Sequence, residues 1–184
     1  MSSVIVIGDG PGGLSAALFL AKNKVDVAIY GQDKTAMHWA LVRNYLGLPE
    51  IMGAEFQAIA RAQVGAFGVT VQDEHIDKVE KTGDGFKVTF ASGGTASSKY
   101  LVLSEGKSPK LAKQLGLTFD EKTGIATDKN AKSTLDGVYV VGRMSRPGRS
   151  QAIISAGDGA AAAIDILSRE KREDFVDWDE PPKT

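Results

Sequence analysis

Residues 3–20 read SVIVIGDGPGGLSAALFL, and this stretch decides how the rest of the chain is interpreted. The β-branched run at residues 4–7 is typical of a buried strand, and the Ala- and Leu-rich stretch after the glycines predicts a helix. Gly8 is expected to make the sharp turn out of the strand, Gly10 to let a pyrophosphate approach the backbone, and Gly13 to let the helix lie close to the strand. The helix N-terminus would then face the phosphates. A glycine-rich turn that binds nothing is the weaker alternative.

The composition bounds the class of protein. A chain of 184 residues is long enough for one domain of moderate size. Its formal net charge of -1 argues against nucleic acid as the main partner. The chain has no cysteine, which excludes disulphides, thiolate catalysis and thiolate metal sites within it. His38 and His75 stand far apart, so we predict no metal site. Without an apolar run of membrane-spanning length or a leader, we expect no membrane association and a cytoplasmic protein.

Strand and helix patterns alternate along the rest of the chain. A second strand is expected at residues 25–30, an amphipathic helix with core aromatics at 53–67, and a short strand at 69–71. Alternating runs separated by glycine turns predict a small antiparallel meander, at residues 77–81, 86–91 and 100–103. There follow a short helix, an extended segment, a buried strand and a long helix, at residues 110–115, 124–127, 137–141 and about 150–167.

These elements predict a single α/β domain. We expect a Rossmann-like fold with a mainly parallel sheet, helices on both sides and the small meander. The domain is expected to cover residues 1–168, followed by a charged tail at 169–184 with Phe175 and Trp178 as candidate anchors. Within the long helix, Gly157 and Gly159 each cost about 1 kcal/mol relative to alanine. They therefore predict a close backbone approach by another element or a ligand.

Two local questions stay open on the sequence alone. The end of the second strand in a nucleotide-binding βαβ unit usually presents an acid to the ribose hydroxyls. Here the best-placed residue is Gly31, so either Asp33 reaches in from the loop or the ribose is held by backbone and Lys34. The segment at residues 35–49 is apolar without a clean period. It fits a lid over a flat ligand and a loop covering the core equally well.

Five separated segments then occur in a recognisable order. They are the glycine loop at residues 8–13, RNYLG at 43–47, LVLSEG at 101–106, GVYVVG at 137–142 and SQAIISAGDG at 150–159. Together they resemble the low-molecular-weight thioredoxin reductases, within the flavin-dependent pyridine nucleotide-disulphide oxidoreductases. The likeness spans nearly the whole chain up to about residue 167 and implies an FAD-binding domain. Such reductases also carry a second nucleotide domain with its own glycine-rich loop and a redox Cys-x-x-Cys pair. In this chain SEGKSP at 104–109 looks like the point from which that insert is missing.

The resemblance also implies a cofactor site, residue by residue. The FAD pyrophosphate would be held by Gly8, Gly10, Pro11, Gly12 and Gly13. The adenosine ribose would lie near the strand edge that contains Gly31, Gln32 and Lys34. The isoalloxazine would be approached by Asn44, the adenine by the backbone around His75 and Ile76, and the pyrimidine end of the flavin by Gln151 and Ala152. A helix N-terminus at that last position would favour the negative charge of a reduced flavin.

Three positions depart from the family pattern. The family's Ala-Thr-Gly is Ser104-Glu105-Gly106 here, which puts a carboxylate beside the expected cofactor path. Its Gly-Asp after the late strand is Gly142-Arg143, and an arginine cannot accept the hydrogen bond of a ribityl hydroxyl. The acid or threonine often found at the second strand end is Gly31. Arg143 would either donate to the pyrophosphate, for which its fork is suited, or pair with Glu105.

Three functions are compatible with these features. We favour an FAD-dependent, thioredoxin reductase-like oxidoreductase that lacks dithiol exchange and takes electrons from NAD(P)H or a redox partner protein. The alternative is a non-catalytic module that binds FAD or another adenine dinucleotide, alone or as a subunit of a larger complex. The third is an NAD(P)-binding Rossmann protein without flavin. The family resemblance also implies a homodimer.

Overall fold

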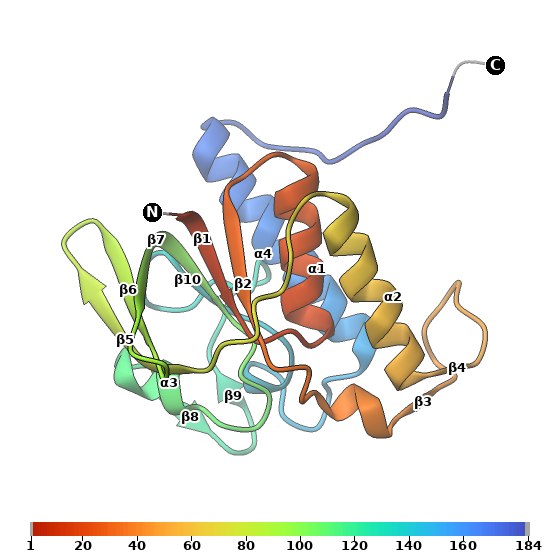
Figure 1. Cartoon of the computed structure of the whole chain (residues 1–184), viewed down its shortest axis with the longest axis horizontal. Helices are drawn as coiled ribbons and strands as arrows, with labels where there is room; N and C mark the ends of the chain where they lie inside the picture. The colour runs from red at the N-terminus through yellow and green to blue at the C-terminus, as the bar shows by residue number, and fades with distance from the viewer. Residues whose placement is uncertain (1, 183–184) are drawn as a thin grey trace.

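The computed structural model describes residues 2–182 and is built around a six-stranded sheet (Figure 1). Four strands pair in parallel, in the order β2 (Val27–Tyr30), β1 (Ser2–Ile7), β7 (Thr95–Leu103) and β10 (Val138–Val140). The first half of β7 also pairs antiparallel with β6 (Gly85–Phe90), which in turn pairs with β5 (Ile76–Thr82). The expected α/β fold, with a mainly parallel sheet and an antiparallel meander, is therefore confirmed. The third strand of the meander was wrongly expected at residues 100–103, which pair in parallel, whereas residues 95–98 make the antiparallel pairs.

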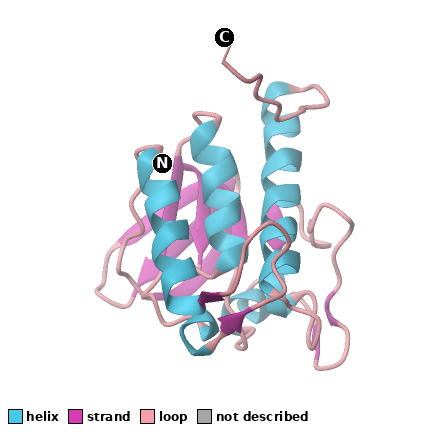
Figure 2. Ribbon diagram, turned by 90° about the vertical axis from the view of Figure 1, so that its right-hand side faces the viewer, coloured by secondary structure: helices cyan, strands magenta, loops and turns pink. Residues whose placement is uncertain are grey.

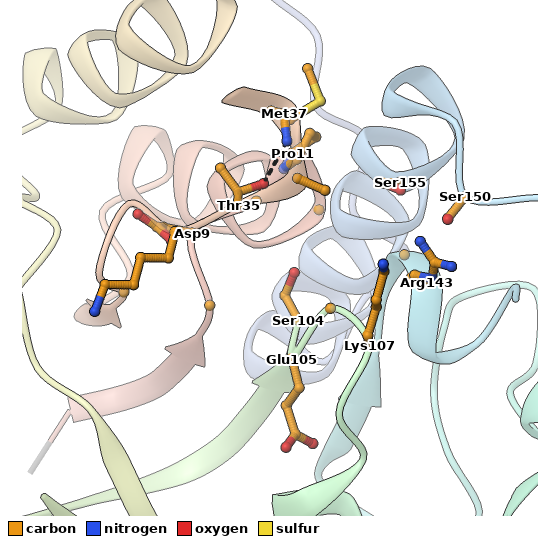
Figure 3. A pocket seen from close by; sticks show the side chains of 18 of the residues that line it. Asp9, Pro11, Thr35, Met37, Ser104, Glu105, Lys107, Arg143, Ser150 and Ser155 are labelled. Atoms are coloured by element: carbon orange, nitrogen blue, oxygen red, sulfur yellow. Dashed lines mark hydrogen bonds between the residues drawn. The ribbon is translucent and has the colours of Figure 1, made fainter. Parts of the chain in front are cut away.

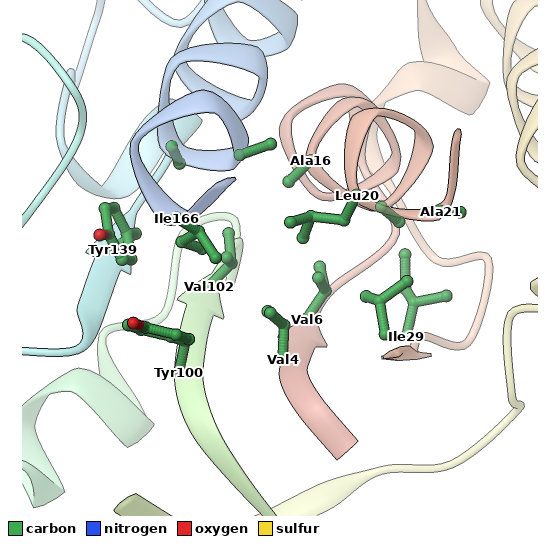
Figure 4. Packing of buried hydrophobic residues seen from close by; sticks show 14 of the residues in the cluster. Val4, Val6, Ala16, Leu20, Ala21, Ile29, Tyr100, Val102, Tyr139 and Ile166 are labelled. Carbon is green, nitrogen blue, oxygen red and sulfur yellow. The ribbon is translucent and has the colours of Figure 1, made fainter. Parts of the chain in front are cut away.

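Three helices cover one face of the sheet: α1 (Pro11–Lys22), α2 (Gly53–Ala66) and α4 (Ala152–Lys171) (Figure 2). Side chains alternate across a strand, so every second residue of the central strands points at these helices. Val6 and Val102 meet Leu20 of α1 and Ile166 of α4 in one buried cluster (Figure 4). This cluster fixes the two helices α1 and α4 against the parallel strands.

The opposite face is covered mainly by the meander and by the short helix α3 (Lys110–Gln114). Ile5 and Leu101 point to this side and pack in a second cluster with Phe86 of β6 and Leu111 of α3. Two short strands, β8 (Phe119–Asp120) and β9 (Gly124–Ile125), pair with each other beyond α3. Helices therefore lie on both sides of the sheet, as expected, but the second side has one short helix.

Residues 35–52 form a small subdomain beside the sheet. It contains the 3-10 helix η1 (Ala36–Trp39) and the hairpin of β3 (Leu41–Val42) and β4 (Ile51–Met52). Met37, Val42 and Ile51 are buried together in a third cluster, whereas Trp39 is 92% exposed and Leu46 is 90% exposed. The segment thus has an inner side that forms core and an outer side that faces solvent.

Helices α1 and α4 approach each other very closely at Gly159. A Cβ atom at this position would overlap the carbonyl oxygen of Gly12 and lie 3.0 Å from the backbone nitrogen of Ala16. The predicted close approach is confirmed here. It is wrong for Gly157, which is exposed and would have no atom within 4 Å of an added Cβ.

Several expected elements differ in the structure. Residues 69–71 do not form a strand, because only Gln72 bridges to Tyr30 before the chain turns away. Phe67 was expected in the core but is 47% exposed at the end of α2. Helix α4 continues to Lys171, about one turn beyond its expected end.

In the tail, Phe175 packs against the first cluster while Trp178 is 79% exposed, so only Phe175 is an anchor. The division into a domain at residues 1–168 and a tail at 169–184 stays a prediction. Within residues 2–182, no helix combines the length and apolarity that crossing a membrane requires.

Candidate functional site

A cavity of about 830 Å³ opens at the carboxyl ends of the parallel strands. Its walls come from the loops that follow β1, β2, β7 and β10, and from η1 and the start of α4. Ligands of open parallel sheets bind at this edge, where loops from neighbouring strands meet. The volume lies in the usual range of small-molecule and cofactor pockets.

The glycine loop joins β1 to α1 along one wall. Gly8 has a φ of +97°, and a Cβ there would overlap the carbonyl oxygen of Ser104 in the loop after β7. Gly13 is buried, and a Cβ there would overlap the carbonyl oxygen of Gly8. The turn and the close helix packing expected of these two glycines are therefore present. Gly10 is the N-cap of α1 and Pro11 is its first residue, and the first turn contains no acidic residue.

Helix α4 begins on the other side of the same cavity. Gln151 is its N-cap, and no acidic residue lies in its first turn. The side-chain Nδ2 of Asn44 donates a hydrogen bond to Oε1 of Gln151 over 2.9 Å, although the two residues are 107 positions apart in sequence. The unpaired N–H groups of both helix N-termini make this cavity favourable for a negatively charged ligand.

The residues expected to contact a cofactor gather around this one cavity, with a single exception. Gly13 lies behind the glycine loop and does not line the cavity. The residues that do line it are Gly8, Gly10, Pro11, Gly12, Gly31, Gln32, Lys34, Asn44, His75, Ile76, Glu105, Gly106, Gly142, Arg143, Gln151 and Ala152. That these residues bind a cofactor stays a prediction.

Other lining residues were missed by sequence reasoning, among them Asp9, Thr35, Ser104, Lys107 and Ser155. Asp9, Ser104, Lys107 and Ser155 had a usable signal, because they lie inside segments that the sequence analysis recognised, whereas Thr35 lies outside them. Figure 3 shows Asp9 at one end of the cavity and Lys107 and Arg143 toward the other. Asp9 and the two cations Lys107 and Arg143 therefore line different parts of the cavity.

Asp9 is buried and held by α2. Its Oδ2 atom pairs with Arg61 and accepts a hydrogen bond from the backbone N–H of Asp33 over 3.1 Å. Gln57 donates from Nε2 to the backbone carbonyl of Asp9. The carboxylate of Asp33 lies 3.0 Å from Nε2 of His38. These contacts fix the glycine loop to α2.

Glu105 has a structural role. Its carboxylate accepts hydrogen bonds from the backbone N–H groups of Leu111 over 2.7 Å and Ala112 over 2.9 Å, at the start of α3. Burial raises the pKa of Glu105, and these two N–H groups oppose that shift. The expected alternative of a Glu105–Arg143 ion pair is wrong. Figure 3 shows the Glu105 side chain directed away from Arg143.

Arg143 follows β10 in the 3-10 helix η2 (Gly142–Met144). It is exposed at the cavity and forms no ion pair within residues 2–182. The neighbouring Arg146 is occupied, because its Nε lies 3.1 Å from both carboxylate oxygens of Asp158 on α4. Within the described part of the chain, Arg143 is therefore a cation at the cavity with no ion-pair partner.

Comparisons with known proteins agree with this arrangement. A family model described as "Pyridine nucleotide-disulphide oxidoreductase" matches residues 2–50 and 42–159. The chain is 29% identical over 175 residues to the bifunctional thioredoxin reductase/thioredoxin of Mycobacterium leprae, covering 92% of this chain and 36% of that protein. It is 28% identical over 172 residues to the thioredoxin reductase of Streptomyces coelicolor, covering 91% and 50%. The chain thus spans half or less of the length of these curated relatives.

Solved structures share the fold at lower sequence identity. A thioredoxin reductase from Gloeobacter violaceus superposes with a TM-score of 0.85 at 15% identity, covering 98% of this chain and 99% of that one. The atypical thioredoxin reductase TRi from Desulfovibrio vulgaris Hildenborough gives a TM-score of 0.83 at 16% identity, covering 94% and 99%.

Proposed function

Because the chain belongs to the pyridine nucleotide-disulphide oxidoreductase family, whose domains bind FAD, we propose that its cavity holds FAD as the cofactor of a flavin oxidoreductase. One observation carries the proposal. The N-termini of α1 and α4, which belong to distant parts of the sequence, open onto a single cavity. An extended dinucleotide has its charged groups spaced along its length, and this cavity offers a favourable electrostatic field at two places.

The lining residues fit the parts of FAD in order. Gly10, Pro11 and Gly12 at the start of α1 would receive the pyrophosphate. The hydrogen-bonded pair of Asn44 and Gln151 would lie at the flavin end. The start of α4 would favour negative charge on the flavin ring after reduction. FAD, when bound, supplies the acceptance and release of electrons, and the chain supplies orientation and the electrostatic field.

Electrons would reach the flavin from outside this chain. The sequence has no cysteine for dithiol exchange, so we propose NAD(P)H or a redox partner protein as the donor. Thioredoxin is not expected to be reduced by this chain alone.

We also propose a homodimer. Several large apolar side chains of the segment at residues 35–52 are exposed in the single chain, among them Trp39, Leu46 and Met52. Sedimentation velocity over a range of concentrations should show a dimer, and a monomer at all concentrations would contradict this proposal.

The test of the cofactor proposal starts from the purified chain incubated with FAD. We expect flavin to remain bound through gel filtration, with a visible flavin spectrum, and to be released as FAD on denaturation. NADH, NADPH and reduced ferredoxin are then added separately without oxygen, with dithionite as the control that the bound flavin can be reduced. Bleaching by at least one donor supports an oxidoreductase.

The remaining outcomes separate the alternatives. Flavin that only dithionite reduces, together with an assembly state that depends on FAD, favours a non-catalytic binding module. A chain that retains no flavin but binds NAD(P) overturns the FAD proposal.

A further inference from the structure

The end of β2 carries no side chain where nucleotide-binding βαβ units usually present an acid to the ribose hydroxyls. Gly31 follows the last residue of β2, and its place in the chain corresponds to that strand end. A Cβ atom at Gly31 would lie 2.6 Å from the Cβ of Asp9, and it would overlap the Asp9 carboxyl carbon. The carboxyl group of Asp9 therefore occupies the space in which a side chain at position 31 would begin.

The Asp9 carboxylate is anchored through one oxygen only. Both Arg61 and the N–H of Asp33 contact Oδ2. Within residues 2–182, Oδ1 of Asp9 accepts no hydrogen bond. Among the side-chain oxygens and nitrogens of these residues, Gln57 Oε1 is the only one that is fully buried and has no hydrogen-bond partner, so Oδ1 of Asp9 is not fully buried. Oδ1 therefore keeps some contact with solvent, and Asp9 lines the cavity while its side chain is only 6% exposed. A carboxylate oxygen of this kind has free acceptor capacity for a ligand hydroxyl.

We propose that Asp9 recognises the adenosine ribose of the bound dinucleotide. Its Oδ1 accepts a hydrogen bond from a ribose hydroxyl, in place of an acid at the strand end. Gly31 is then required because the Asp9 carboxylate needs its space. Arg61 and the Asp33 N–H orient the carboxylate from behind and do not themselves contact the ribose. This inference rests on the proposed dinucleotide site and adds the residue that reads its sugar.

The competing role for Asp9 is purely structural. The Asp9–Arg61 ion pair would then only tie the glycine loop to α2, with no ligand contact. The two roles differ in what they predict for sugars that lack one hydroxyl. A structural anchor changes the affinity for all adenine nucleotides equally, whereas a ribose acceptor changes the affinity only for sugars that can donate the hydrogen bond.

The experiment measures binding of ADP, 2′-deoxy-ADP and 3′-deoxy-ADP to the full chain by calorimetry. ADP contains the ribose and the pyrophosphate but no flavin, so the result does not depend on redox activity. We expect the wild-type chain to bind ADP about tenfold or more tightly than at least one deoxy analogue. Asp9→Ala removes the acceptor and should bind ADP and that analogue with nearly equal affinity. Asp26→Ala, at an exposed aspartate that does not line the cavity, is the control and should keep the wild-type preference.

A second set of variants covers the case in which Asp9→Ala fails to fold. Gly31→Asp should destabilise the wild-type chain, because its Cβ meets Asp9. The double variant Asp9→Gly with Gly31→Asp should fold and regain the preference for ADP, since the acid then comes from the strand end.

Several outcomes would overturn the inference. They are equal wild-type binding of all three nucleotides, an Asp9→Ala variant that keeps the preference, or a folded double variant without it. Absence of any ADP binding overturns it as well. Retention of FAD is measured separately. FAD bound without sugar preference refutes only the role of Asp9, and sugar preference without FAD retention refutes only the flavin function.

Discussion

Arg143 gives the cavity a charge opposite to the one that the family pattern has at this position. Where the thioredoxin reductase-like pattern has an aspartate, this chain exposes a guanidinium with no ion pair within residues 2–182. Lys107 lines the same cavity, and the start of α4 adds its own partial positive charge. These positive groups attract an anionic ligand to the cavity.

We therefore expect Arg143 to bind the pyrophosphate of FAD. Arg143→Gln should weaken FAD binding about tenfold, since a hydrogen bond to a charged group is worth about 1.5–3 kcal/mol. Arg149→Gln is the matched control, because Arg149 is exposed but does not line the cavity. Titration of FAD followed by flavin fluorescence measures both affinities. Equal affinity for the two variants would contradict a direct contact.

Glu105 makes a prediction about pH. Burial raises its pKa in the folded chain above the ordinary value of 4.5. The folded state therefore binds a proton more readily than the unfolded state, and this group contributes less stability as the pH rises from 4.5 through its folded pKa.

The difference in free energy of unfolding between wild type and Glu105→Gln should accordingly fall as the pH rises from below 4.5 to neutrality. Urea unfolding across this range measures the difference, in which the titration of other groups cancels. The same measurement on Glu121→Gln, at an exposed glutamate, is the control for the replacement itself. A Glu105→Gln difference that stays constant or grows with pH would refute the assigned burial effect.

At the scale of elements, the crossing of α1 and α4 depends on one of two glycines in the same helix. Gly159→Ala should lower the free energy of unfolding by about 1–3 kcal/mol, because its Cβ overlaps the backbone of α1 and the helices must move apart. Gly157→Ala should raise it by about 1 kcal/mol, because the site is exposed, open and helical. Thermal and chemical unfolding of the two variants test this pair. Equal effects of the same sign would show that the close approach does not control the packing.

These elements also show which features a sequence can predict. The β1–loop–α1 unit was predictable because strand, turn and helix signals are contiguous and each glycine has a local reason. The strand expected at residues 69–71 does not form. Its β-branched residues predicted a strand, but they gave no sign that only Gln72 reaches β2. The strand pattern was local, whereas the pairing depended on the path of the chain after it.

Prediction of the site from the sequence has the same limit. Many of its lining residues could be predicted from motifs, but the partners of their side chains could not. Glu105 caps α3, and the carboxyl group of Asp9 fills the space beside Gly31. No periodicity in the sequence connects the residues that meet in either contact. Likewise, the two glycines of α4 look alike in sequence, and only the position of α1 distinguishes them.

At the scale of the whole molecule, the site depends on two parts of the chain that meet at β7. The first part supplies β1 and α1, the second supplies β10 and α4, and β7 pairs with both β1 and β10. Residues 104–109 leave β7 as an irregular loop, with Lys107 and Ser108 exposed. This is the place where the resemblance to larger reductases puts their second nucleotide domain. If the two parts assemble through β7 and the helices, the length of this loop should matter little for folding.

We therefore expect a flexible Gly/Ser linker of about twelve residues between Lys107 and Ser108 to be tolerated, because each doubling of loop length costs only about 0.6 kcal/mol. The same linker between Val141 and Gly142 is the control. There the N–H of Val141 donates to the carbonyl of Leu103 over 3.0 Å, and the N–H of Gly142 lies 3.4 Å from Asp158 Oδ2. Circular dichroism and thermal unfolding should show a cooperative transition within a few degrees of wild type for the first insertion and a large loss of stability for the second. If both insertions unfold the chain alike, the loop at residues 104–109 is part of the folding core and the two parts do not assemble independently of it.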